Sequence, residues 1–349
     1  MKPRQKKVLC AVSGGIDSSV AVVLLRRQGF RVVACFLRLH DKSSEAEKRA
    51  KKIAHHLSIP LCIIDLRKEF KEKVINYFIK EHRKGRTPNP CVVCNEKIKI
   101  SFLLKKAKQF KCDFIATGHY ARKKEVRNKK NGKVIYKLFK AKDKKKDQSY
   151  FLWRLNQRQL AHILFPIGDY TKNEVKKLAK EFRLPVFDIP ESQEICFISD
   201  SLDDFLTRHI KNKAGKIVDI KGNELGKHQG LFSYTIGQRK GIKLPGGPYY
   251  VVSKDIKKNI LVVSKNKKDL LKKQLLIGDI NWISGKKMSL PLKAKVKIRY
   301  RHKGVLAIIK SYRKDYLEVI FSRPQEAITP GQSAVFYKGQ EVLGGGVIY

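Results

Sequence analysis

The N-terminal half of the chain alternates short apolar runs with amphipathic stretches, which is the pattern of strands followed by helices. Apolar residues at helical spacing predict helices over 18–27, 44–57 and 68–82. Apolar runs of strand length lie at 8–12, 31–37, 61–65 and 112–117. Because strands alternate with helices, we predict an α/β fold with a doubly wound parallel sheet. Such a sheet binds its ligand at the carboxyl ends of the strands.

The rest of the chain has a different pattern of predicted elements, in which short strands become dominant. A hairpin is predicted over 121–142, around Asn131-Gly132, and a short strand over 191–198 holds the last cysteine. Helical patterns lie at 156–163 and 171–182. After about Leu206, β-rich runs follow one another at 249–253, 260–264, 293–300, 305–311 and 316–321. They predict a small central β-rich domain and a C-terminal β-barrel or sandwich. The expected domains are 1–205, 206–278 and 279–349.

The first strand ends in a glycine turn that is suited to an anion. Gly14 and Gly15 let the backbone approach a phosphate, and the positive end of the following helix points at the same spot. The segment Ser13-Gly14-Gly15-Ile16-Asp17-Ser18 lacks the lysine of a Walker A motif, which disfavours a γ-phosphate-cleaving site of the usual kind. It resembles the PP-loop of ATP pyrophosphatases, which release pyrophosphate from ATP. Asp17 would help to hold Mg²⁺ there. The alternative is an ordinary tight strand–helix turn.

Charge and cysteine content narrow the class of protein. Lys and Arg number 77 against 31 Asp and Glu, a net charge of +46, so a polyanion such as nucleic acid is the expected partner. A general enrichment in lysine would give the same balance. No apolar run approaches ~18 residues, so we expect no membrane span. Seven cysteines, several in strand-like runs, indicate reduced thiols in the cytoplasm. Four of them are expected in the core: Cys10, Cys35, Cys62 and Cys112.

A loop with two prolines, residues 85–95, carries two more cysteines. The prolines favour an irregular chain, and a helix is predicted to begin near Asn95. Cys94 would then lie at a helix N-terminus, where the dipole lowers the pKa of a thiol. Gly118 and His119 follow the predicted strand 112–117, at a carboxyl end of the sheet.

Six motifs in order carry a resemblance to a known family. They are the PP-loop, Gly-Arg-Thr-Pro-Asn-Pro-Cys91-x-x-Cys94-Asn, Ala-Thr-Gly118-His119-Tyr, Lys146-Asp147-Gln148-Ser-Tyr, Ser-Gln-Glu-Ile-Cys196-Phe and Tyr234-Thr-Ile-Gly-Gln-Arg-Lys. Together they resemble the tRNA-specific 2-thiouridylases over essentially the whole chain. The resemblance implies a PP-loop domain, a small central domain and a C-terminal β-barrel. It also implies sulfur transfer to the wobble uridine of tRNA, with ATP and a persulfide donor such as a cysteine desulfurase or a sulfur relay protein.

The resemblance also assigns roles to residues. Cys196 would carry the persulfide and Cys94 would be the attacking nucleophile. ATP would be held by Ala11, Val12, Ser13, Gly14, Gly15, Ile16, Asp17, Ser18, Leu37 and Gly118. The target base would lie against Asn89, Pro90 and Cys91. The tRNA would be contacted by His119, Lys146, Asp147, Gln148, Arg299, Tyr300 and Gln332.

The chemistry fits these residue types. A uracil 2-carbonyl oxygen leaves poorly, and adenylation converts it into departing AMP. Two cysteines can then release a sulfur nucleophile, provided that the fold brings their Cα atoms within ~7 Å for a disulfide. Base access requires flipping the wobble nucleotide, which is cheap in an anticodon loop.

Several alternatives remain open. Some family members have aspartate where this chain has Cys91, so the loop reads Cys-x-x-Cys. It could bind zinc, form a redox pair, or ligate an iron–sulfur cluster together with Cys196. We favour the route without a tightly bound cofactor, because several family members carry this cysteine too. The rival classes are another PP-loop adenylating ligase and a non-catalytic RNA-binding protein.

Overall fold

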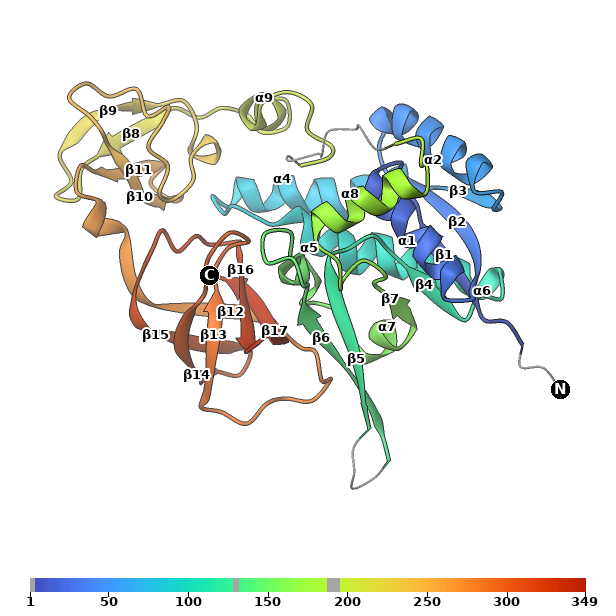
Figure 1. The fold of residues 1–349 in the computed structure, drawn as a ribbon. Helices are drawn as coiled ribbons and strands as arrows, with labels where there is room; N and C mark the ends of the chain where they lie inside the picture. Colours follow the sequence, from blue (N-terminus) through green and yellow to red (C-terminus); the bar gives the residue numbers. More distant parts are fainter. Residues whose placement is uncertain (1–3, 128–131, 187–194) are drawn as a thin grey trace.

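The computed structural model describes residues 4–127, 132–186 and 195–349. Its N-terminal part contains a five-stranded parallel sheet with the strand order β3-β2-β1-β4-β7 (Figure 1). The strands are β1 Lys7–Ala11, β2 Arg31–Arg38, β3 Leu61–Asp65, β4 Phe114–Ala116 and β7 Ile163–Leu164. Their alternation with helices forces crossover connections, and the predicted doubly wound α/β domain is confirmed.

Helices cover both faces of this sheet. One face packs against α1 Ile16–Arg27, α2 Ser44–His56 and α8 Lys172–Glu181. The other packs against α5 Pro90–Cys94, α6 Ser101–Gln109 and α7 Gln157–His162. Val8 and Cys10 of β1 point into the first core and Leu9 into the second, as the two-residue period of a strand requires. Burial on both faces explains why these strands are continuous apolar runs.

Two long helices beside the sheet each contain a π-helical turn. The first consists of α3 Arg67–Phe70, the π-helical segment Lys71–Ile75 and α4 Asn76–Arg83. The second consists of α5, the π-helical segment Asn95–Ile100 and α6. They share a separate apolar core with α9 Leu202–Thr207, here called the phenylalanine core because five of its buried residues are phenylalanines. π-Helical turns are rare and shift which side chains share a face of the helix.

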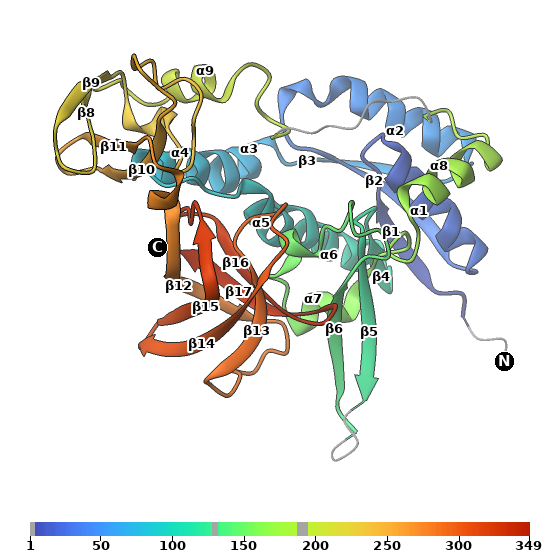
Figure 2. The same cartoon turned by 60° about the vertical axis from the view of Figure 1, so that its left-hand side comes forward.

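The C-terminal part is a closed antiparallel barrel (Figure 2). Its strand order is β12-β15-β14-β13-β16-β17, and β12 also pairs with β17, which closes the ring. The strands are β12 Leu271–Trp282, β13 Leu292–Lys297, β14 Val305–Arg313, β15 Tyr316–Glu326, β16 Ser333–Lys338 and β17 Glu341–Ile348. The prediction of a C-terminal β-barrel is confirmed.

The predicted hairpin joins this barrel to the N-terminal domain. It consists of β5 Ala121–Arg127 and β6 Val134–Lys140, and its predicted turn lies outside the described residues. Residues Leu138 and Phe139 of β6 pair with Val342 and Glu341 of β17. The hairpin is thus continuous with the barrel sheet, which fixes the barrel against the N-terminal domain.

A small central module comes between these two parts in the chain, and in the structure it lies at one end of the molecule, next to α9 (Figures 1 and 2). Its sheet has the order β10-β11-β8-β9, with β8 Gly215–Val218, β9 Glu224–His228, β10 Tyr250–Asp255 and β11 Ile260–Ser264. Short 3₁₀ turns complete the described structure at Asp41–Ser43, Ser149–Leu152, Leu231–Ser233 and Lys267–Leu270. A hydroxyl contact of 3.1 Å between Thr87 and Thr235 ties the central module to the proline loop.

Two local predictions are wrong. The helix expected near Asn95 begins at Pro90, because proline is well tolerated in the first turn of a helix. A strand is also expected over 191–198. Its first half lies outside the described residues, which exclude 187–194, and in its second half Cys196 and Phe197 form a turn and not a strand. None of the helices in the described ranges is long and apolar enough to cross a membrane.

Candidate active site

The glycine turn after β1 has the geometry of a phosphate-binding loop. Gly14 has a φ of 77°, and a Cβ atom there would lie 2.4 Å from the carbonyl oxygen of Ala46. Only glycine fits this position. Helix α1 begins after Gly15, and no side chain caps its N-terminus. The N-terminal amide groups of α1 therefore point, uncapped by a side chain, at the edge where the parallel strands end.

Serine hydroxyls fix the shape of this loop. Ser18 Oγ accepts a hydrogen bond of 3.1 Å from the amide of Ser13 and donates one of 3.0 Å to the carbonyl of Gly15. Gly118, which follows β4, packs against the start of α1, since a Cβ there would lie 2.8 Å from the amide nitrogen of Ser18. The structure thus brings Gly118 to the loop, as expected from the order of the strands.

Asp17 is held by two groups from distant parts of the chain. Its Oδ1 atom accepts hydrogen bonds of 2.7 Å from the Tyr120 hydroxyl and from the Lys172 ammonium. Lys172 is buried at the start of α8. Sequence reasoning did not identify this lysine, although the capping box Thr171-x-x-Glu174 marks the start of its helix. A cation therefore lies beside the loop even though the loop itself lacks one.

The remaining residues expected at ATP lie along the same edge of the sheet. Ala11 ends β1, and Val12 follows it and donates its amide to the carbonyl of Cys35 at 2.8 Å. Leu37 lies at the end of β2 and is half-buried between the second core and the phenylalanine core. Ile16 is buried in the first turn of α1.

The cysteine loop positions its residues through the start of α5. Asn89 is the N-cap residue and hydrogen-bonds the Tyr150 side chain, and Pro90 is buried at the first helical position. Cys91 is exposed, whereas Cys94 is buried at the end of α5. The prediction that Cys94 lies at the helix N-terminus is therefore wrong. Burial raises the pKa of its thiol to about 12, the opposite of the expected shift.

Cys196 reaches the same place from a remote segment. It lies exposed on its turn, and the neighbouring Phe197 is buried, with its ring 5.7 Å from that of Phe70 and 5.5 Å from those of Phe78 and Phe205. A charge on Cys196 raises the pKa of Cys94, and a charge on Cys91 raises the pKa of both. The three thiols are thus electrostatic neighbours. All are free.

Lys99 is the cation of this cluster. Its ammonium lowers the pKa of the Cys91, Cys94 and Cys196 thiols, although loss of water around each sulfur atom has the larger, opposite effect, even on Cys91 and Cys196, whose residues as a whole are exposed. Lys99 also helps to lower the pKa of His119 to about 3, after the burial of that ring. His119 directly follows Gly118, which packs on the phosphate loop, so the charge of Lys99 acts on both the thiols and the segment beside that loop.

The residues expected at tRNA around 146–148 have structural partners. Asp147 is buried and accepts hydrogen bonds of 3.1 Å from the amides of Ala141 and Ser149. Gln148 accepts one of 3.0 Å from the amide of Tyr120, and Lys146 is half-buried. The Nδ1 atom of His119 lies 2.8 Å from the Thr117 hydroxyl. These groups hold the segment beside the loop after β4.

Of the barrel residues expected at tRNA, Gln332 contacts the proline loop. Gln332 donates a hydrogen bond of 2.8 Å to the carbonyl of Thr87. Tyr300 is half-buried, with its ring 4.6 Å from that of Phe151. Arg299 is exposed and donates to the carbonyl of Glu326 at 3.1 Å. The barrel thus lies against the segment that begins the cysteine helix.

The described residues contain no group of three or more His, Cys, Asp or Glu side chains arranged to hold a metal ion.

Comparison with known proteins places this architecture in a family. Three family models match in succession: a tRNA methyl transferase HUP domain over residues 6–200, a tRNA methyl transferase PRC-barrel domain over 203–265 and an aminomethyltransferase β-barrel domain over 272–348. Among solved structures, NMN synthetase from Francisella tularensis is 16% identical, with a TM-score of 0.32, over 54% of this chain and 67% of that one. A score this low carries no weight.

Curated relatives match at nearly full length. The tRNA-specific 2-thiouridylase MnmA 2 of Thermoanaerobacter sp. (strain X514) is 46% identical over 98% of this chain and 97% of its own. The tRNA-specific 2-thiouridylase MnmA of Clostridioides difficile (strain 630) is 43% identical over 98% of each chain. The phosphate loop, the converging cysteines and these matches agree, and the chain belongs to the tRNA-specific 2-thiouridylase family.

Proposed function

We propose that this protein is a tRNA 2-thiouridylase, an ATP-dependent sulfurtransferase that replaces the 2-oxygen of the wobble uridine by sulfur. One observation carries the proposal. Two cysteines from segments about a hundred residues apart, Cys94 and Cys196, are electrostatic neighbours; the charge of Lys99 acts on both and on His119, and Gly118, which precedes His119, packs on the phosphate loop. A PP-loop ligase that joins an amine or an ammonia to its substrate has no use for such a thiol pair, and a non-catalytic RNA-binding protein has no use for the loop.

The first step assigned to the site is adenylation. The loop Ser13–Ser18 binds the phosphates of ATP through backbone amides and hydroxyls, and Leu37 contacts the adenine. Ala11, Val12 and Gly118 complete the nucleotide site. Mg²⁺ accompanies the phosphates, and Asp17 is the carboxylate beside it, with its charge partly balanced by Lys172. Attack of the uridine 2-oxygen on the α-phosphate releases pyrophosphate and leaves AMP on that oxygen.

The second step is sulfur transfer. A donor such as a cysteine desulfurase or a sulfur relay protein loads a persulfide on Cys196. The Cys94 thiolate attacks the Cys196 sulfur, the sulfur–sulfur bond of the persulfide breaks, and hydrosulfide leaves as a disulfide forms. Hydrosulfide adds to C2 of the uridine and expels AMP. A thiol reductant then supplies two electrons to restore both cysteines. No tightly bound cofactor takes part.

The tRNA is assigned to the basic surface around this site. Asn89, Pro90 and Cys91 surround the flipped base, since Cys91 is exposed beside Cys94. His119, Lys146, Asp147 and Gln148 line one side of the anticodon loop, and Arg299, Tyr300 and Gln332 of the barrel line the other. Buried Asp147 acts by shaping its loop. The net charge of +46 favours association with the phosphate backbone. We place the reaction in the cytoplasm, where thiols stay reduced.

Thiolation of unmodified tRNA tests this proposal. Purified protein is incubated with ATP, Mg²⁺ and a cysteine desulfurase, and 2-thiouridine and pyrophosphate are measured. Cys94→Ser and Cys196→Ser should abolish 2-thiouridine, and Cys112→Ser is the matched control with normal activity. An amino acid that stimulates ATP cleavage would instead favour a PP-loop ligase. Binding of tRNA that is indifferent to Ser13 and Asp17 substitutions, without thiolation, would favour the RNA-binding class.

An iron assay on the same preparation tests the cluster alternative. Full activity without iron supports the disulfide route. Activity that depends on iron would make Cys91, Cys94 and Cys196 cluster ligands and would overturn the sulfur step, although not the identity of the product.

A further inference from the structure

The charged groups that act on the ammonium of Lys99 are all cysteine thiols. It is half-buried, and burial alone would lower its pKa, but the charges of Cys94, Cys196 and Cys91 together raise it; no carboxylate is among these groups. Within residues 4–127, 132–186 and 195–349, no ion pair is formed by its ammonium. Partial burial of a lysine without a carboxylate partner is costly, so its position among the thiols indicates an anion that is present at some stage of the reaction.

The helix geometry explains how Lys99 reaches the thiols. Residues 95–100 form a π-helical turn, and the Ser101 hydroxyl bonds the carbonyl of Glu96, five positions earlier. Five positions cover one π-helical turn but well over one turn of an α-helix with 3.6 residues. Lys99, five positions after Cys94, is therefore brought toward the face of the helix that carries this cysteine.

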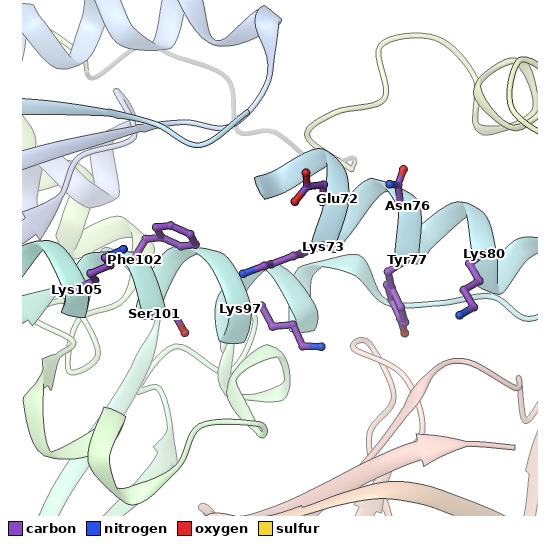
Figure 3. Close-up of a pocket in the computed structure, with 9 residues that line it drawn as sticks. All are labelled: Glu72, Lys73, Asn76, Tyr77, Lys80, Lys97, Ser101, Phe102 and Lys105. Atoms are coloured by element: carbon purple, nitrogen blue, oxygen red, sulfur yellow. The ribbon is translucent and has the colours of Figure 1, made fainter. Parts of the chain in front are cut away.

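The neighbouring lysine on the same turn faces elsewhere. Lys97 is exposed and lines a groove of about 780 Å³ between the two long helices, together with Lys73, Tyr77 and Phe102 (Figure 3). The thiols are not among the residues that line this groove. Lys97 therefore lines the groove while Lys99, two positions later, acts on the thiols. A substitution of Lys97 is thus a matched control for one of Lys99.

We propose that Lys99 is a positioning residue for sulfur transfer, whose ammonium holds the anionic sulfur atoms of the Cys94–Cys196 pair during release of sulfur. The inference rests on the proposed function. During the attack, negative charge moves from Cys94 Sγ to the departing hydrosulfide, while Lys99 stays protonated throughout. A fixed positive charge next to that path favours both the thiolate before the step and the hydrosulfide after it.

The other titratable groups around the cluster do not supply this charge. Burial, and after it the charge of Lys99, lowers the pKa of His119 in the loop after β4 to about 3, so this imidazole is neutral near pH 7. Cys91 and Cys196 are thiols whose charges would only oppose that of Cys94. Among the described residues, the core that contains Cys94 also contains Phe197 and Val93, which are apolar. Among the residues that the structure describes, Lys99 is thus the cation that acts on all three thiols.

Alkylation of the cysteines tests the effect on the thiols directly. Carbamidomethylation rates at Cys94 and Cys196 are measured by peptide mass spectrometry from pH 7 to 10, for the full-length wild type, Lys99→Gln, Lys99→Arg and Lys97→Gln. We expect Lys99→Gln to move both pH profiles upward and to lower both rates at pH 8 about tenfold, which corresponds to roughly one pKa unit. Lys99→Arg should restore most of the rate, and Lys97→Gln should match the wild type.

Turnover separates this role from a structural one. Lys99→Gln should lower the kcat of thiolation about tenfold and leave the KM for tRNA and the rate of pyrophosphate release unchanged. Unchanged alkylation profiles, or equal effects of Lys97→Gln, would overturn the inference. So would loss of pyrophosphate release in Lys99→Gln, which would indicate a role in folding or adenylation. If the wild type alkylates as expected but does not thiolate tRNA, the proposed function fails instead.

Discussion

The proposed phosphate loop and the proposed sulfur site are built from the sequence in opposite ways. Residues within ten positions of one another make the loop, and the glycine at position 14 has the strained φ that only this residue adopts easily. The sulfur site joins Cys94, inside a helix, to Cys196, on a turn anchored by Phe197. A local motif is sensitive to backbone changes, whereas an assembled site is sensitive to the packing that holds its parts together.

Changing Gly14 should have the largest effect and should affect only the loop. In Gly14→Ala, the Cβ atom meets the carbonyl of Ala46 at 2.4 Å and the backbone retains a strained φ of 77°. Strain alone costs about 1–3 kcal/mol, and the clash adds to it. We expect pyrophosphate release to fall about a hundredfold or more, with alkylation of Cys196 unchanged.

Gly29→Ala is the control for strain without a clash. Gly29 has a φ of 83° at the end of α1, and nothing lies within 4 Å of a Cβ atom there. This variant should lose stability but keep its rate of pyrophosphate release. Equal losses of rate in the two variants would mean that the loop fails through general destabilisation, and the contrast between the two regions would not hold.

Changing Phe197 should damage the sulfur site and spare the loop. Its ring packs among Phe70, Phe78 and Phe205, and its removal leaves a cavity under the turn that carries Cys196. Phe197→Ala should cost about 3 kcal/mol in the free energy of unfolding and lower thiolation by more than pyrophosphate release. Urea denaturation and the two rates measure this. Phe205→Ala should cost similar stability with a smaller loss of thiolation, and the reverse order would contradict the anchoring role.

The difference between a local motif and an assembled site also explains which features can be predicted from the sequence. Strand, glycine turn and helix follow one another in the first 27 residues, so the phosphate loop can be recognised from local pattern alone. The start of the cysteine helix was misplaced because Pro90 is compatible with a loop and with the first turn of a helix. The pairing of Leu138 with Val342, and of Asp17 with Lys172, joins segments more than 150 residues apart, for which no local pattern exists.

Removing Lys172 should have a moderate effect on the loop. Lys172→Met leaves the Asp17 carboxylate with the Tyr120 hydroxyl but without the cation 2.7 Å from its Oδ1 atom. We expect pyrophosphate release to fall about tenfold, since a charge-assisted hydrogen bond is worth roughly 1.5–3 kcal/mol. Lys176→Met, exposed on the same helix, is the control with no change. A normal rate in Lys172→Met would show that the ion pair serves stability alone.

The smallest effect that we expect is a loss of stability in mild acid. It arises from His82 on α4, a helix of the core that contains Cys94. His82 is buried on α4, and burial followed by the charge of Lys254 lowers its pKa to about 4. The unfolded chain takes up a proton below pH 6.5 that the native protein does not bind, so the contribution of His82 is complete above pH 6.5 and is lost as the pH falls towards 4. One pKa unit corresponds to 1.36 kcal/mol, so the free energy of unfolding should fall by about 1–2 kcal/mol between pH 7.5 and 5.5 through this group.

Urea titrations at the two pH values measure this loss. His82→Phe keeps an aromatic ring next to Phe78, whose centroid lies 4.6 Å from that of His82, and removes the proton uptake. The variant should therefore lose less stability at pH 5.5 than the wild type, whereas exposed His55→Gln should behave as the wild type. An identical pH dependence in His82→Phe would assign the acid sensitivity to another group, of which His119, with its pKa of about 3, is the first to test. That outcome would mean that the acid-sensitive histidine lies in the loop after β4, between the phosphate loop and the thiols, and not on α4.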